Sequence, residues 1–203
     1  TVQYSMAVSK IRQPMGYKQV VPSRNQGERS VATLDNEFLG DLITPRIGPL
    51  EEWTLGVLES IKENPRYGLQ KVTFPKGSVR EQGRPSIEST YREVVARALA
   101  SYLSQSGDFT YTLEIKRVNP NVDPVVDFLL NVKKGHCERY ASGLVLMLRS
   151  LGIPSRVIKG FRGCNYSDNG SYVIRNNQAH SWVEVLVPQL SADGTFKQDI
   201  VSG

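Results

Sequence analysis

The sequence is poor in the residues that most often carry reactions and hold metal ions, since its 203 residues include two cysteines and two histidines. These four residues show neither C-x-x-C nor H-x-x-x-H spacing, so no metal site and no cofactor are expected. No apolar run approaches the roughly 18 to 20 residues that a membrane-spanning helix needs. The start, "TVQYSMAVSK", lacks the charged leader and hydrophobic stretch of a signal peptide.

The excess of positive over negative side chains is also small. Lys and Arg number 25 against 20 Asp and Glu, which gives a formal net charge of +5. Because this excess falls short of a nucleic-acid-binding composition and no motif of that class is present, no nucleic acid partner is expected. Hydrophobic residues make up 39% of the chain, enough for the core of a globular domain.

Three apolar patterns predict helices in the middle of the chain. They cover 49–64, 87–106 with Ser86 as N-cap, and 121–132 with Asp123 as cap and Pro124 at the first helical position. Alternating apolar residues predict a strand over 108–115. The first fifty residues hold short apolar pieces between prolines, glycines and polar residues, which is typical of loops and short strands.

The C-terminal third has the clearest pattern. Four residues at i, i+3, i+4 and i+7 mark one face of a helix that Cys137 begins: Leu144, Met147, Leu148 and Leu151. Gly152 and Pro154 end this helix. Three β-type runs follow, over 155–163, 171–176 and 179–187, separated by turn residues. The sequence therefore predicts an α+β fold with the Cys137 helix packed on a small antiparallel sheet.

Cys137 is placed where a thiol becomes reactive. The unpaired amides and dipole at a helix N-terminus stabilise the thiolate, and the same amides can receive an oxyanion. Gly135 would allow a tight turn and leave room for a substrate. The plainer interpretation of Cys137 is a small apolar residue in the first turn of a helix, which is the commoner role of a cysteine.

Two histidines are available as a base. His136 is adjacent to Cys137 in sequence, so their side chains diverge, and a surface or capping role is expected for it. His180 lies in "QAHSWVEVLV" on the same strand face as Trp182, from which it could reach Cys137. A strand histidine is more often a half-buried polar residue. Trp182 is expected to wall the site, to belong to the core, or both.

The segment "GHCERYASGLVLMLRSLGIPSRVIKGFRG" followed by "AHSWVEVLVP" resembles the core of the bacterial transglutaminase-like superfamily. The resemblance extends from about Asp123 to Pro188. It implies a papain-like site with Cys137 as nucleophile and His180 as base, and acyl transfer on peptide or glutamine-type amides of a protein or peptide substrate. The superfamily includes transglutaminases, proteases and amidases. The competing interpretation is a catalytically inactive transglutaminase-like binding module.

The third member of the site departs from the family pattern. The family places an aspartate-proline-threonine run after the histidine strand, and its aspartate orients the histidine. Here "DGTFKQDIVSG" offers Asp199, which Ile200 follows instead of proline. Either Asp199 is a divergent orienting residue, or the true one lies beyond residue 203, which we favour. The expected domains are a mixed N-terminal extension, 1–85, and a transglutaminase-like core, 86–203, truncated at its C-terminus.

The segments "FTYTL" and "DPVVDFLL" are similar to those that lead into this core in membrane-anchored bacterial proteins. This resemblance implies a membrane tether outside the present chain and an extracytoplasmic location. The chain opens on Thr1, as an excised piece of a longer protein would.

Two further features carry less information. Cys164 lies among turn residues and is expected to be an incidental thiol, since a disulfide to Cys137 would remove the nucleophile. The range 133–163 contains seven basic residues and one acidic residue, Glu138. The basic residues would either attract acidic substrates or form a solvated basic face.

Overall fold

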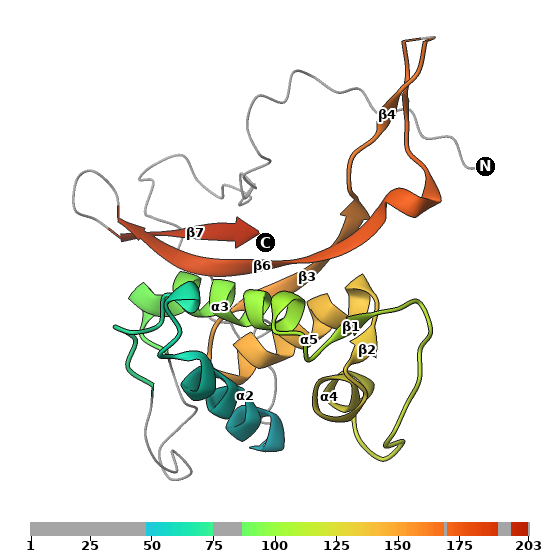
Figure 1. Cartoon of the computed structure of the whole chain (residues 1–203). Coiled ribbons are helices and arrows are strands. Elements are labelled where there is room, and N and C mark those ends of the chain that lie inside the picture. Colours follow the sequence, from blue (N-terminus) through green and yellow to red (C-terminus); the bar gives the residue numbers. More distant parts are fainter. Residues whose placement is uncertain (1–47, 75–86, 169, 191–195, 203) are drawn as a thin grey trace, which may run out of the picture. The chain divides into compact units, whose positions relative to one another are not determined.

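The computed structural model describes residues 48–74, 87–168, 170–190 and 196–202, with side chains up to residue 187. All of them belong to one compact unit, Leu34–Gly203. Helices lie on one side of an antiparallel sheet (Figure 1), which confirms the α+β class. Among the described residues, no helix is both long enough and apolar enough to cross a membrane.

The helices form one layer of the structure. The α-helices are α2 (Gly48–Ile61), α3 (Arg92–Gln105), α4 (Pro124–Asp127) and α5 (Cys137–Ser150), with a π-helical turn, η3 (Phe128–Val132), directly after α4. Short 3-10 turns occupy Pro65–Tyr67, Ser89–Tyr91 and Asn176–Gln178. A single hydrophobic core joins α2, α3, α5 and the sheet, with Leu50, Leu99 and Leu148 fully buried. Burial of these apolar side chains holds the layer together.

Local signals account for most helix ends. Asp123 caps α4 as expected, because its carboxylate accepts the amides of Val125 at 2.8 Å and Val126 at 3.3 Å. The end of α5 follows the predicted glycine, since Gly152 has a left-handed φ of 70° and its amide donates to the Arg149 carbonyl at 3.1 Å. The predicted start of α3 is wrong. This helix begins at Arg92 after a 3-10 turn, and Ser86 lies outside the described residues.

The main sheet has three antiparallel strands in the order β3 (Ser155–Phe161), β6 (Ala179–Leu190) and β7 (Phe196–Ser202). The third strand, β7, was not predicted, and it pairs with the far half of β6. The middle of the three predicted runs does not join this sheet. Its residues form β5 (Tyr172–Val173), which pairs with β4 (Asn165–Tyr166).

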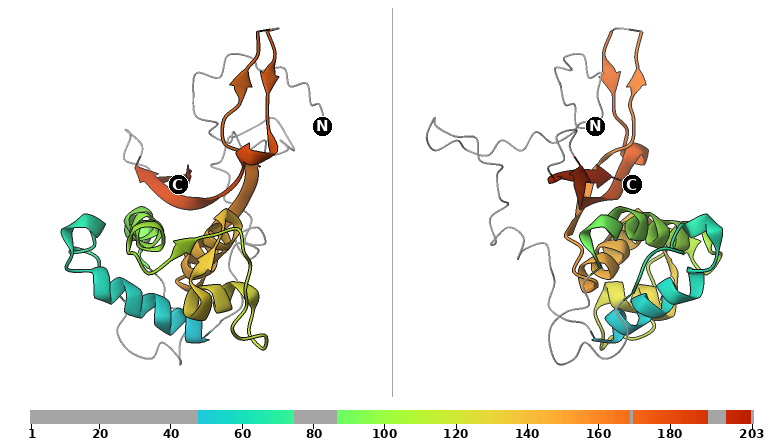
Figure 2. Two further views of the ribbon diagram at one scale, coloured as in Figure 1. Left: turned by 45° about the vertical axis from the view of Figure 1, so that its right-hand side comes forward. Right: turned by 90° about the vertical axis from the view of Figure 1, so that its left-hand side faces the viewer.

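The β4–β5 hairpin extends away from β3 and β6 (Figures 1 and 2). Its tip closes at Gly170, whose φ of 82° suits a glycine and whose amide donates to the Ser167 carbonyl at 2.9 Å. Turn residues between the predicted runs therefore directed the middle run into a separate hairpin.

The strand predicted over 108–115 is mostly absent. Only β1 (Thr110–Tyr111) forms, paired in parallel with β2 (Lys134–Gly135). Leu113 and Ile115 alternate as a strand would, yet 78% and 57% of their surfaces are exposed. Alternation alone did not make a strand here, because neither face of the segment is buried.

The two faces of β6 have different surroundings. Val183, Val185 and Val187 are buried in the core shared with the helices. His180, Trp182 and Glu184 alternate with them and belong to the opposite face. Residues 48–74 contribute to the same core as the sheet, so the described part of the expected N-terminal extension packs with the core domain. The boundary at residue 85 stays a prediction.

Candidate active site

Cys137 is the first residue of α5, as predicted, and its free thiol is half-buried. His136 is the N-cap residue, with an extended φ of −108° and no hydrogen bond from its side chain to the helix. Its carbonyl instead accepts the amides of Arg139 at 2.9 Å and Tyr140 at 3.2 Å. The first amides of a helix lack intrahelical acceptors, so the start of α5 has backbone donors available to a bound ligand.

The chain before Cys137 is held by the β1–β2 ladder, in which the amide of Thr112 donates to the Gly135 carbonyl at 2.8 Å. The role predicted for Gly135 is wrong. Its φ is not left-handed, and a Cβ there would lie 2.9 Å from the Arg139 side chain and 3.3 Å from the Phe128 ring. A glycine is therefore needed because those two side chains pack against it, and the space is not open to a substrate.

An ion pair links the first turn of α5 to the sheet. Lys159 Nζ on β3 lies 2.7 Å from Glu138 Oε1, and this hydrogen bond and charge lower the pKa of Glu138. Lys159 precedes Gly160, which lies directly opposite His180 in the register of β3 and β6. The first turn of α5 and the start of β6 thus meet at the same end of the helix–sheet layer. The sequence showed Glu138 only as the single acidic residue among seven basic ones, and its contact with Lys159 was not predicted.

Trp182 lies beside the half-buried His180. A Cβ added to Gly160 would lie 2.8 Å from a carbon of the Trp182 ring, so the indole covers the strand position opposite His180. Glu184, two residues further on, is 7% exposed and binds Arg156 of β3 with an N···O distance of 2.7 Å. Trp182 is therefore placed to wall the region around His180, which is one of the two roles predicted for it.

The described residues do not form a complete hydrogen-bonded triad. Among the described residues, no hydrogen bond joins Cys137 Sγ to the His180 ring, and no carboxylate binds that ring. The backbone of Asp199 lies opposite Val187. This position is seven residues along β6 from His180, or about 23 Å at roughly 3.3 Å per residue. The spacing agrees with the expectation that Asp199 does not orient His180.

Other predicted features lie around this region. Cys164 is a free, exposed thiol before β4. Within the part of the chain that the structure describes, no group of three or more His, Cys, Asp or Glu residues could hold a metal ion. Several of the seven basic residues have structural partners besides the two ion pairs above. Arg149 donates to the Ser155 carbonyl at 2.9 Å, and Lys133 lies 5.8 Å from the centroid of the Phe109 ring.

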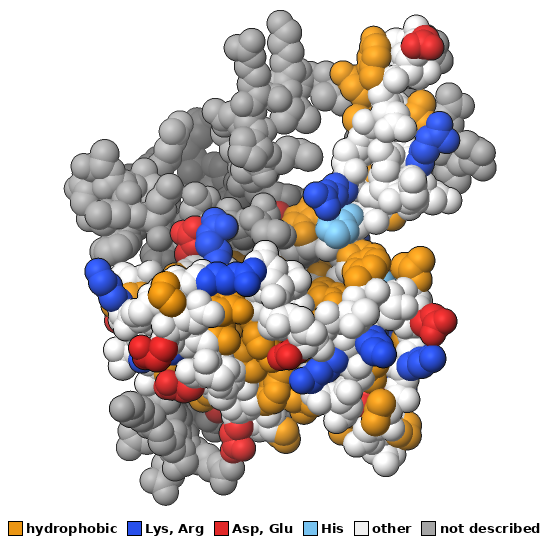
Figure 3. Space-filling model, in the orientation of Figure 1, with side chains coloured by type: hydrophobic (Ala, Val, Ile, Leu, Met, Phe, Trp, Pro, Cys, Tyr) orange, Lys and Arg blue, Asp and Glu red, His pale blue; other side chains and the backbone are white. Residues whose placement is uncertain are grey.

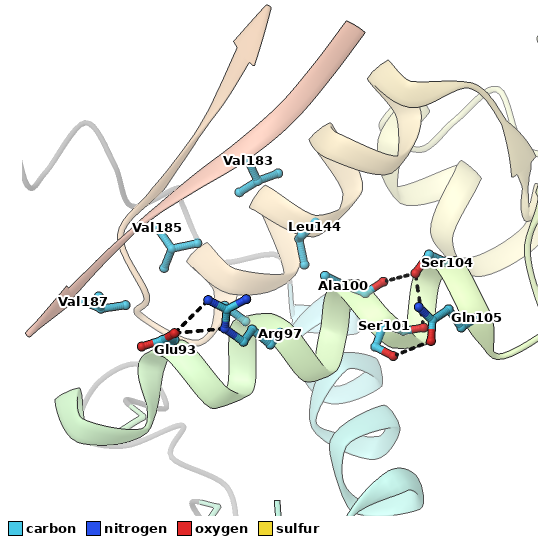
Figure 4. A pocket seen from close by; sticks show the side chains of 11 residues that line it. Glu93, Arg97, Ala100, Ser101, Ser104, Gln105, Leu144, Val183, Val185 and Val187 are labelled. Atoms are coloured by element: carbon cyan, nitrogen blue, oxygen red, sulfur yellow. Dashed lines mark hydrogen bonds and ion pairs between the residues drawn. The ribbon is translucent and has the colours of Figure 1, made fainter. Parts of the chain in front are cut away.

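A separate pocket of about 280 Å³ lies between α3 and β6. Figure 4 shows its two walls: an apolar wall with Val183, Val185 and Val187, and a polar wall along α3. On the polar wall, Arg97 and Glu93 form an ion pair with an N···O distance of 2.9 Å. Neither Cys137 nor His180 lines this pocket, so it is distinct from the candidate active site.

Several known proteins are similar to this chain in sequence or in fold. The family model described as the transglutaminase-like superfamily matches residues 85–194. A protein-glutamine gamma-glutamyltransferase of Pseudomonas aeruginosa is 38% identical over 178 residues, which are 80% of this chain and 26% of that protein. The uncharacterized protein YebA of Bacillus subtilis is 42% identical over 99 residues, which are 46% of this chain and 13% of that protein.

A solved structure resembles the fold. The periplasmic domain of TgpA from Pseudomonas aeruginosa, bound to ethylmercury, superposes with a TM-score of 0.52 at 21% identity, over 84% of this chain and 49% of that one. The present chain spans about a quarter or less of the two curated relatives. The family model covers more than half of this chain, and its range includes both Cys137 and His180. The chain belongs to the transglutaminase-like superfamily.

Proposed function

We propose that this chain carries out thiol-dependent acyl transfer on peptide or glutamine-type amides, with Cys137 as nucleophile and His180 as proton carrier. The observation that supports this function best is the position of Cys137 at the start of α5. The ion pair between Glu138 and Lys159 holds that helix end near the strand position opposite His180. We expect the Cys137 sulfur and a His180 ring nitrogen to lie slightly beyond hydrogen-bond reach in the unliganded protein and to approach when substrate binds.

The reaction has two steps that use the same two residues. The Cys137 thiolate attacks the amide carbonyl carbon, and amides at the start of α5 stabilise the resulting oxyanion. The His180 imidazolium gives its proton to the leaving nitrogen, which departs as ammonia or an amine and leaves a thioester on Cys137. An amine or water then attacks the thioester, loses a proton to His180, and releases a new amide or a carboxylic acid with the free thiolate.

The acceptor and location are inferred from relatives. One relative is named a protein-glutamine gamma-glutamyltransferase, which favours a protein glutamine as acyl donor and an amine as acceptor. The similar solved structure is a periplasmic domain, which favours an extracytoplasmic location. The membrane tether outside this chain is proposed from the resemblance of "FTYTL" and "DPVVDFLL" to segments of membrane-anchored proteins. Hydrolysis of the thioester by water remains the protease or amidase outcome of the same chemistry.

The test is incubation of the protein with a glutamine-containing peptide and a fluorescent primary amine, followed by mass spectrometry. Transfer replaces ammonia with the amine, hydrolysis of the side-chain amide converts glutamine to glutamate, and hydrolysis of a backbone amide splits the peptide into two fragments. Cys137→Ser and His180→Ala should each lower product formation at least a hundredfold, because proton transfer alone contributes about 10²- to 10⁴-fold. Cys164→Ser is the matched control and should retain activity. Unchanged turnover in Cys137→Ser would exclude this site.

A catalytically inactive binding module is the second candidate. It is favoured by the absence, among the described residues, of a hydrogen-bonded carboxylate at His180. Iodoacetamide separates the two functions without knowledge of the substrate, since it reports thiolate reactivity. An enzyme should show faster alkylation of Cys137 than of Cys164, and slower alkylation of Cys137 in His180→Ala. Equal rates for the two thiols, unaffected by His180→Ala, would favour the binding module.

A further inference from the structure

Residues 110–118 expose an unusual row of apolar side chains next to the active site. Tyr111, Leu113, Ile115 and Val118 are 62%, 78%, 57% and 66% exposed. The segment continues from β1 as the yellow-green loop on the right of Figure 1. Figure 3 shows hydrophobic surface on that side of the molecule, where β1, β2 and the start of α5 lie. Large apolar side chains that are exposed within one short segment are candidates for an interaction surface.

The near end of this segment is connected to the nucleophile. The amide of Thr110 donates to the Lys133 carbonyl just before β2, and the amide of Thr112 donates to the carbonyl of Gly135, two residues before Cys137. The Tyr111 ring also contacts Tyr140 of α5, with a centroid distance of 6.3 Å. Tyr140 lies one helical turn after Cys137, so the apolar row begins at the turn that carries the thiol.

The far end is fixed by a buried carboxylate. Asp127 is 1% exposed, and its two oxygens accept the amides of Val118 at 2.9 Å and Asn119 at 3.0 Å. Asn131 donates to the same carboxylate at 2.8 Å. Although little of the segment is regular strand, both its ends are therefore held, and an ordered surface loses less conformational entropy on binding.

The segment has an open backbone edge and positively charged neighbours. Since the amides of Thr110 and Thr112 donate to the carbonyls of Lys133 and Gly135, the amide of Tyr111 between them points to the opposite edge, where a further strand could pair. Lys134 is exposed and lies directly opposite Thr110. Arg139 packs on Gly135. Neither basic side chain forms an ion pair with a described residue.

We propose that residues 110–118 form a docking segment for an extended stretch of the acyl-donor peptide, apolar at alternate positions and acidic near the reactive amide. Alternate peptide side chains pack on Leu113 and Ile115, while the peptide backbone pairs with the open edge at Tyr111. The basic side chains of Lys134 and Arg139 attract the acidic residues. This inference rests on the proposed function, since the segment selects the substrate of the Cys137 thiol.

The test measures binding separately from turnover. A fluorescein-labelled ten-residue peptide with one glutamine, alternating apolar residues and acidic residues beside the glutamine is titrated against Cys137→Ala, and its anisotropy is recorded. Leu113→Ser/Ile115→Ser should weaken binding about tenfold, because two exposed apolar contacts are removed and the fold is not disturbed. The control Tyr172→Ser removes an exposed aromatic from β5 and should change the affinity less than twofold. N-methylation of alternate backbone amides of the peptide removes the donors that would pair with the edge at Tyr111, and it should also weaken binding about tenfold.

Equal affinity for Cys137→Ala with and without Leu113→Ser/Ile115→Ser would overturn the docking segment, as would an equal loss with Tyr172→Ser. In the protein with Cys137 intact, the double variant should raise KM for this peptide about tenfold while kcat changes less than twofold. If the peptide binds as expected but the intact protein forms no product, the proposed function fails and the docking segment stands. If product forms with an unchanged KM, the docking segment fails and the proposed function stands.

Discussion

Replacing Asp127 with alanine should destabilise the protein by about 3 kcal/mol, because three hydrogen-bond donors would each lose their partner at about 1 kcal/mol, the lower end of the range for partly buried groups. The donors are the amides of Val118 and Asn119 and the side chain of Asn131, at 2.9, 3.0 and 2.8 Å. Arg117 Nε adds a longer ion pair at 3.6 Å. Because water can reach some of these groups in the variant, the loss should not exceed this sum.

The pH dependence identifies the cause. Burial alone would raise the pKa of Asp127, but the hydrogen bonds from Asn131, Val118 and Asn119 and the charge of Arg117 together lower it. A carboxylate with a lowered pKa contributes its full stability above the unfolded value of about 3.9 and loses it as the pH falls through the folded value. The difference in unfolding free energy between wild type and Asp127→Ala should therefore be constant from about pH 7 to 5 and shrink below about pH 4.

Urea unfolding followed by circular dichroism at pH 7, 5 and 3.5 provides the measurement, with Asp168→Ala in the exposed hairpin turn as the matched control. Hydrogen exchange at residues 117–119 should also be faster in Asp127→Ala. The reasoning is refuted if Asp127→Ala unfolds within about 0.5 kcal/mol of the control, the scatter of ordinary surface substitutions. It is also refuted if the difference persists undiminished at pH 3.5.

Three further predictions test the contacts around the site and the core. Gly160→Ala should displace the Trp182 ring, since the new Cβ would lie 2.8 Å from it. In a Trp53→Phe background, Trp182 is the remaining tryptophan and its fluorescence spectrum should shift. An unchanged spectrum would contradict the packing of Trp182 on Gly160. Lys159→Ala should lower the free energy of unfolding by less than about 1 kcal/mol, because the ion pair with Glu138 is largely exposed. It should also raise the pKa of Glu138 toward its ordinary value, as measured by NMR titration. Leu148→Ala should cost about 3 kcal/mol in thermal unfolding, since Leu148 is fully buried; a loss under about 1 kcal/mol would indicate a core that collapses around the gap.

Much of the candidate site could be predicted from local sequence, because helix ends depend on neighbouring residues. Cys137 begins α5, and Gly152 ends it in the left-handed conformation that glycine adopts readily. Asp123 caps α4 through its own side chain. The transglutaminase-like family was identified from the residues around Cys137 and His180, and the family model covers that segment.

The sequence by itself therefore determined where the helices lie, the Asp123 cap of α4, the glycine end of α5 and the family, since these depend on short-range spacing and on local backbone preferences. The tertiary structure alone decided which apolar runs share a sheet. β7 pairs with β6, β5 joins a separate hairpin, and residues 113–115 pair with no described strand, although their alternation is strand-like. Strand pairing and the contact between Lys159 and Glu138 join residues distant in sequence, and their stability depends on what each face buries. No local pattern contains that information.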